Sequence, residues 1–147
     1  MTDPDVLEVS LHIEARPETV FRYFTDPARY AQWMGSEATI EAVPGGIYCV
    51  RMGNGVEARG QFVEIAEPRR IVFTWGWIHD PAVAPGSTRV EVTLSGRADG
   101  TDVVLRHYGL PDAAQREHHL AGWQTYVQRL AARATGGDPG PDPNATT

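Results

Sequence analysis

The stretch PDAAQREHHLAGWQTYVQRLAAR, residues 111–133, decides the fold, because the strands expected before it need one long helix to cover them. Its apolar residues recur at steps of three and four, which places one apolar stripe along a single helical face. The stripe consists of Leu120, Trp123, Val127, Leu130 and Ala134. His119 and Tyr126 widen it on one flank, Pro111 suits a first helical turn, and Gly136-Gly137 ends the helix. The pattern predicts a helix that lies against a sheet and forms one wall of an internal pocket.

The residues upstream predict one strand, two short helices and six further strands. Residues 6–15 alternate between apolar and polar, as in a half-buried strand, while Pro17 and Asp26-Pro27 mark two helix starts. The six later strands are predicted at residues 38–43, 47–52, 56–65, 70–77, 88–97 and 102–108. Tight turns such as Asn54-Gly55 join neighbours as hairpins. The fold class is therefore α+β, with a curved seven-stranded antiparallel sheet whose apolar face the C-terminal helix covers.

The chain has the size and composition of one domain. With 147 residues, of which 41% are hydrophobic, it can bury one sizeable core, which we place in residues 1–135. Residues 78–87 form a longer loop with two prolines, a length typical of functional loops, and we expect them at the pocket rim. Residues 136–147 are dense in Gly, Pro and Asp and have nothing to bury, which predicts a disordered tail.

Charge and composition exclude several classes of partner. A formal net charge of -6 disfavours nucleic acid and anionic membrane surfaces. The single cysteine, Cys49, rules out an intramolecular disulfide, and the N-terminus lacks the basic-then-apolar pattern of a signal peptide. No apolar run approaches the roughly 20 residues that span a bilayer. These features predict a soluble, cytoplasmic protein without a membrane partner.

Several short motifs, in this order, resemble one protein family. They are AxPxxVF at residues 15–21, Thr25-Asp26-Pro27, Trp33, Pro44-Gly45-Gly46, Gly60, Phe73-Thr74-Trp75, Gly100-Thr101 and Gly122-Trp123. The sequence from about residue 6 to residue 134 resembles the C-terminal-type domain of homologues of the activator of the heat-shock-protein-90 ATPase. That family belongs to the START-like, or SRPBCC, superfamily, with the birch-pollen-allergen proteins and the polyketide cyclases. The resemblance implies a helix-grip fold whose sheet wraps the last helix and encloses a cavity for apolar molecules.

The pocket should be lined by the inward faces of the strands and of the last helix. In the strand at residues 70–77, the aromatic side chains share one face, which we expect to point inward. The predicted lining residues are Tyr48, Phe73, Trp75, Trp77, Val92, Leu105, His107, Trp123, Tyr126 and Val127. A plain packed core is the competing interpretation, since Gly122 beside Trp123 also suits close helix packing.

His107 is the polar residue of greatest interest, because the pattern places it among apolar neighbours near the helix. It is either a core histidine bonded to a neighbour or a group that orients a ligand or transfers protons, since imidazole changes charge near neutral pH. No metal site or cofactor is expected. His118 and His119 are adjacent in a helix, whereas helical metal ligands need a spacing of three or four.

Three functional hypotheses follow from these observations. The first is binding or sensing of a small hydrophobic or aromatic molecule between sheet and C-terminal helix, without catalysis. The second is a cyclase-like or dehydratase-like enzyme that uses His107 as its acid–base group, with Tyr48 or Tyr126 as hydrogen-bond donors. The third, which follows from the family resemblance, is an interaction module that activates a chaperone ATPase. A homodimer is compatible with all three.

Overall fold

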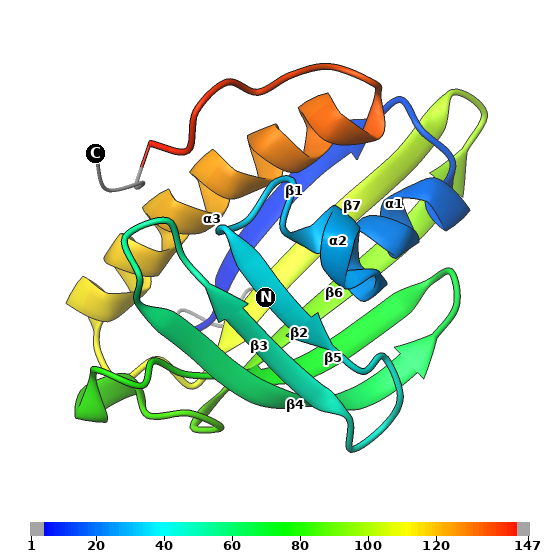
Figure 1. Cartoon of the computed structure of the whole chain (residues 1–147). Coiled ribbons are helices and arrows are strands. Elements are labelled where there is room, and N and C mark those ends of the chain that lie inside the picture. The colour runs from blue at the N-terminus through cyan, green and yellow to red at the C-terminus, as the bar shows by residue number, and fades with distance from the viewer. Residues whose placement is uncertain (1–4, 144–147) are drawn as a thin grey trace.

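A seven-stranded antiparallel sheet curves around the long C-terminal helix in the computed structural model, which describes residues 5–143 (Figure 1). In chain order the elements are β1 (Leu7–Ile13), α1 (Pro17–Thr25), α2 (Pro27–Tyr30), β2 (Glu37–Ile40), β3 (Ile47–Arg51), β4 (Glu57–Ala66), β5 (Arg70–Trp75), η1 (Pro81–Val83), β6 (Thr88–Arg97), β7 (Gly100–Tyr108) and α3 (Ala113–Ala134). The strand order is β1-β7-β6-β5-β4-β3-β2. The predicted α+β helix-grip fold, with its seven strands and two short helices after the first strand, is confirmed.

The start of α3 differs from the prediction. The helix begins at Ala113, because the side chain of Asp112 caps it and accepts a hydrogen bond from the backbone N–H of Gln115 at 2.8 Å. Pro111 therefore lies outside the first turn, and the capping Asp112 marks the start of the helix instead. At the other end, Gly136 adopts a positive φ of 87° and stops the helix as predicted.

One half of the concave sheet face is filled by aromatic side chains beneath α1 and α2. Phe24 and Trp33 pack edge to face with ring centroids 5.2 Å apart, and Tyr48 of β3 stacks on Phe73 of β5 at 4.2 Å. The hydroxyl of Tyr48 is hydrogen-bonded to that of Tyr30. All five side chains are buried. Packed aromatic side chains therefore fill this part of the concave sheet face.

The segment after α3 runs back along the helix instead of leaving the domain (Figure 1). Arg129 donates hydrogen bonds to the carbonyl oxygens of Gly140 and Pro141 at 3.0 and 3.1 Å. The Tyr126 hydroxyl donates to Asp142 at 2.8 Å. Residues 136–143 therefore lie against α3 in this structure, while residues 144–147 of the predicted disordered tail lie outside the described residues.

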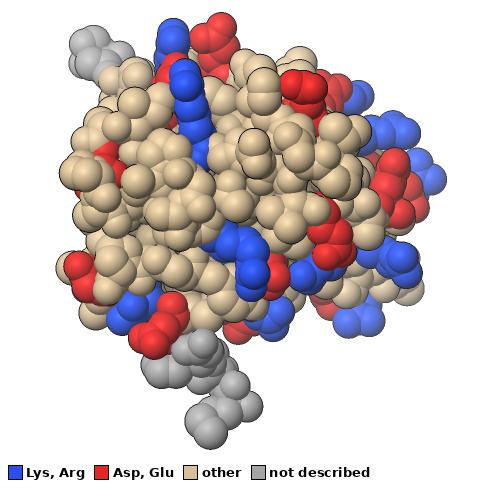
Figure 2. Space-filling view, turned by 90° about the horizontal axis from the view of Figure 1, so that it is seen from below, with Lys and Arg blue, Asp and Glu red and all other residues tan. Residues whose placement is uncertain are grey.

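Charged side chains of both signs are interspersed on the surface that Figure 2 presents. Ion pairs join charged side chains of neighbouring strands, such as Arg70 with Glu91 at 2.9 Å and Arg106 with Glu8 at 2.8 Å. Within residues 5–143, no helix combines the length and apolar character that crossing a membrane requires.

Candidate functional site

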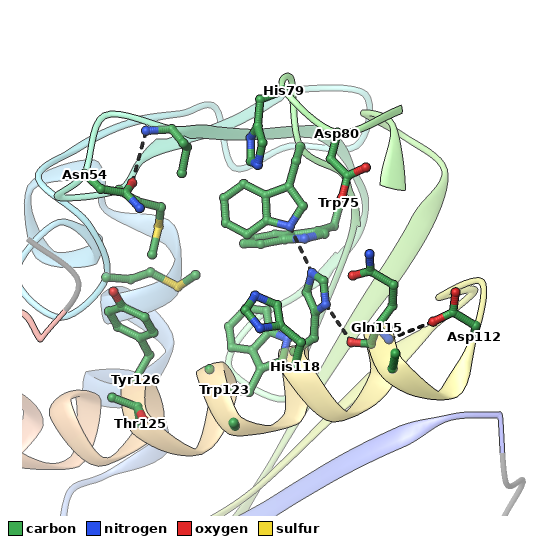
Figure 3. A pocket seen from close by; sticks show the side chains of 18 residues that line it. Asn54, Trp75, His79, Asp80, Asp112, Gln115, His118, Trp123, Thr125 and Tyr126 are labelled. Carbon is green, nitrogen blue, oxygen red and sulfur yellow. Dashed lines mark hydrogen bonds between the residues drawn. The ribbon is translucent and has the colours of Figure 1, made fainter. Parts of the chain in front are cut away.

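A cavity of about 690 Å³ lies between α3 and two loops that face it (Figure 3). One loop is the turn between β3 and β4, which contributes Asn54. The other loop joins β5 to β6 and contributes His79 and Asp80. It belongs to the segment 78–87, which was expected at the pocket rim. Buried side chains form the floor, namely Met34, Met52, Trp75, His119, Trp123 and Tyr126. Exposed residues form the mouth, among them Ala114, His118 and Thr125.

The predicted lining residues divide into two groups in the structure. Four of them line the cavity: Trp75, Trp77, Trp123 and Tyr126. Six others face inward but lie in the packed core behind it: Tyr48, Phe73, Val92, Leu105, His107 and Val127. The division follows from the aromatic core under α1 and α2, which fills part of the space where a ligand was predicted.

The predicted lining did not include Met34, Met52, Asn54 or the residues of the first turns of α3. Met34, Met52 and Gln115 carry no motif that sets them apart from ordinary core or surface positions. Helical spacing could have found part of the set, because Gln115, His119 and Gly122 continue the line of Tyr126 toward the helix N-terminus at steps of three and four.

His107 lies fully buried behind the cavity floor and uses both ring nitrogens in hydrogen bonds. Thr88 donates its single hydroxyl proton to the carbonyl oxygen of Trp75 at 2.7 Å, so its oxygen accepts from Nε2–H of His107 at 2.9 Å. Nδ1 of His107 accepts from Nε1–H of Trp123 at 3.0 Å. These contacts require the neutral imidazole, and burial together with nearby His119 lowers the pKa of His107 to about 3. His107 is thus a core histidine that holds Trp123 in place, and it has no free nitrogen for acid–base chemistry.

His119 holds a second tryptophan from the cavity wall itself. Its Nδ1–H donates to the carbonyl oxygen of Gln115 at 2.8 Å, and its Nε2 accepts from Nε1–H of Trp77 at 2.9 Å (Figure 3). This is the opposite tautomer to that of His107. Burial lowers the pKa of His119, and the neighbouring His118 lowers it further. The neutral imidazole of His119 therefore fixes the indole of Trp77, which follows β5, to α3.

Trp75 lies between these two fixed indoles. Its ring meets Trp77 edge to face at 5.2 Å and Trp123 at 5.3 Å. Nε1 of Trp75 is buried and has no hydrogen-bond partner among the described residues. Buried donors are nearly always paired in native proteins, so one that is unpaired at a cavity wall marks a site of interest.

Gly122 lines the cavity from the interior of α3, where helical structure alone gives no reason for a glycine. Glycine in a helix interior costs about 0.5–1 kcal/mol relative to alanine. A Cβ at this position would meet no atom within 4 Å, so close helix packing, which the sequence suggests, is not the reason for the glycine. Gly122 lies on the cavity wall, and its missing side chain leaves the space open.

These features define a helix-grip domain of the START-like, or SRPBCC, class, with an aromatic cavity against its C-terminal helix. The chain belongs to the family described as "Activator of Hsp90 ATPase homolog 1-like protein", whose model matches residues 14–135. The comparison with curated proteins gave no match.

Solved structures agree with this assignment. An AHSA1-like protein from Rhizobium etli is 40% identical with a TM-score of 0.75, over 97% of this chain and 89% of that one. DynU16, a putative protein in the dynemicin biosynthetic locus, is 26% identical with a TM-score of 0.81, over 93% of this chain. This chain spans about half of DynU16, 49% of its length. The Aha1 dimer from Colwellia psychrerythraea shares the fold at 15% identity, with a TM-score of 0.77 over 90% of this chain and 97% of that one.

Proposed function

We propose that this protein binds a small aromatic molecule in the cavity between α3 and the facing loops, without catalysing a reaction. The observation that carries the proposal is the composition of the wall, in which Trp75, Trp77, Trp123 and Tyr126 surround one space. Aromatic rings pair favourably with other rings in stacked or edge-to-face arrangements. A volume of about 690 Å³ falls within the range of roughly 300–1,000 Å³ that small-molecule pockets occupy.

Two further features support binding over plain packing. The indoles of Trp77 and Trp123 are held by imidazole acceptors, so the wall is formed before a ligand arrives, which lowers the entropic cost of binding. Gly122 keeps the wall open although alanine would favour the helix. Binding is preferred over the enzyme hypothesis because His107, its candidate acid–base group, has both nitrogens engaged behind the floor.

Filling the cavity from Gly122 tests this proposal. We expect Gly122→Phe to weaken binding of the neutral fluorescent probe N-phenyl-1-naphthylamine at least about tenfold, because the new ring occupies the ligand's space. Probe fluorescence in a titration measures the affinity. Gly122→Ala should keep binding and raise the free energy of unfolding by about 0.5–1 kcal/mol.

Gln128→Phe is the matched control, because Gln128 is exposed on α3 and is not a lining residue. It adds the same ring to the same helix and should leave probe affinity unchanged. Equal affinity of Gly122→Phe and the unmodified protein would overturn the proposal. Native mass spectrometry of the protein purified from cells then identifies any small molecule that it carries.

A chaperone contact is the second candidate function, which the description of the family favours. It makes a different prediction, namely that the protein stimulates the ATPase of an Hsp90-type chaperone and that Gly122→Phe leaves this stimulation unchanged. ATP turnover with and without the protein separates the two candidates, since a buried ring in the cavity does not alter the outer surface.

A further inference from the structure

The cavity lining is electrostatically one-sided. Among residues 5–143, the carboxylates of Asp80 and Asp112 belong to the lining, and no arginine does. Arginine is the only strongly basic residue type in this sequence, which contains no lysine. His119 of the wall is held neutral by its two hydrogen bonds. Among the described residues the lining therefore offers no arginine to pair with a carboxylate or phosphate of a ligand, and its other basic groups are the imidazoles of His79 and His118.

The two carboxylates lie at the same end of the cavity, close to the beginning of α3 (Figure 3). Each uses one oxygen in a local cap, since Asp80 accepts from the N–H of Ala82 at 3.0 Å and Asp112 from that of Gln115 at 2.8 Å. Within residues 5–143 neither forms an ion pair with arginine, in contrast to acids such as Glu57 and Asp102. The second carboxylate oxygen of each aspartate is therefore available to pair with a cationic group of a ligand.

The start of α3 also contributes to the field at this end. A helix N-terminus carries a partial positive charge of roughly half an elementary charge, which the Asp112 cap offsets. Asp80 lies across the mouth on the opposite loop and adds a full negative charge. The two carboxylates together outweigh the partial positive charge of the helix N-terminus, so the electrostatic field favours a cation at this end of the cavity.

From these observations we infer that the ligand is a small aromatic amine, with its ring among Trp75, Trp77 and Trp123 and its ammonium group toward Asp80 and Asp112. This inference rests on the proposed function and specifies the class of ligand. Tryptophan faces attract cations through the ring quadrupole, and a nearby carboxylate adds Coulomb attraction that salt screens. At pH 8, where imidazole is uncharged, an anionic analogue of the same size meets two carboxylates and no arginine.

Three probes that share one ring separate charge from shape: tryptamine, which is cationic, tryptophol, which is neutral, and indole-3-acetate, which is anionic. Each is titrated at pH 8, where imidazole is uncharged, while the indole N–H resonances of the protein are followed by NMR. We expect tryptamine to bind about tenfold more tightly than tryptophol, and indole-3-acetate to bind most weakly. The preference for tryptamine should shrink as salt is raised.

Conservative variants assign the effect to the two carboxylates. Asp80→Asn and Asp112→Asn keep an amide oxygen that caps a helix start, so the fold is preserved while the charge is removed. Each should weaken tryptamine several-fold and leave tryptophol unchanged. Asp138→Asn is the matched control, because Asp138 also accepts from a backbone N–H, that of Gly140, but is not a lining residue.

The outcomes distinguish this inference from the proposed function. Equal affinities for the three probes, or tighter binding of tryptophol or indole-3-acetate, would overturn the inference and leave the aromatic pocket standing. Tryptamine binding that survives both substitutions would overturn it as well. If none of the probes moves the indole resonances and Gly122→Phe leaves N-phenyl-1-naphthylamine binding unchanged, the proposed function fails and the inference fails with it.

Discussion

Replacing Trp123 with alanine is expected to lower the free energy of unfolding by about 3–5 kcal/mol. Trp123 is 3% exposed, it packs against Trp75, and its Nε1–H is the donor to the buried Nδ1 of His107. Alanine removes the ring and leaves that nitrogen without its partner. Urea denaturation followed by circular dichroism measures the loss.

Two further variants separate the contributions to this loss. Trp123→Phe keeps much of the ring but removes the donor, so it should cost about 1–3 kcal/mol, the penalty for an unsatisfied buried group. Gln124→Ala, at an exposed neighbouring position of the same helix, should change stability by less than about 0.5 kcal/mol. A loss for Trp123→Ala no larger than that of Gln124→Ala would contradict the described packing.

Acidification is expected to destabilise the protein strongly through His107. The unfolded chain binds a proton at this residue below about pH 6.5, whereas the folded chain, with its pKa lowered to about 3, does not. Between these values the unfolded state binds more protons, so stability falls by about 1.4 kcal/mol per pH unit as the pH falls. The total loss is about 5 kcal/mol, a large part of the stability of a small domain.

The His107→Leu variant isolates this effect from other titrating groups. The lowered pKa of His119 and those of Glu57 and Asp102 also reduce stability in acid, so the contribution of His107 is the difference in slope between the two proteins. The variant should be less stable at pH 7, because Thr88 and Trp123 lose their partner, but less sensitive to acid.

NMR of the unmodified protein gives an independent check. The imidazole of His107 should stay in its Nε2–H tautomer at pH 5. Protonation of His107 near pH 6.5 in the folded state would rule out the hydrogen-bond network.

The elements of the fold were predictable because each has a local cause. The stripe along α3 follows from helical spacing, and hairpins follow from turns such as Asn54-Gly55. The prediction failed where a single side chain sets a boundary, as Asp112 does for α3. Composition also does not indicate the contacts of residues 136–143 with Arg129 and Tyr126, because these contacts join positions that are not neighbours in the chain.

The candidate site was predictable only in part. Alternation along β5 correctly places Phe73 and Trp75 on the inward face, and both are buried. Whether an inward residue lines a cavity or lies in solid core depends on what packs opposite it. Tyr48 covers Phe73, while no side chain of residues 5–143 fills the space in front of Trp75 and Gly122.

Periodicity along the chain is enough to predict which faces of the strands and of α3 are apolar, and with them the helix-grip arrangement, because it is a property of neighbouring residues. The position of the cavity, the tautomers of His107 and His119, and the joint placement of Asp80 and Asp112 at one end depend on the folded structure. Those features depend on contacts between residues far apart in the chain, such as Trp77 with His119, whose pairing is set only when the sheet closes on the helix.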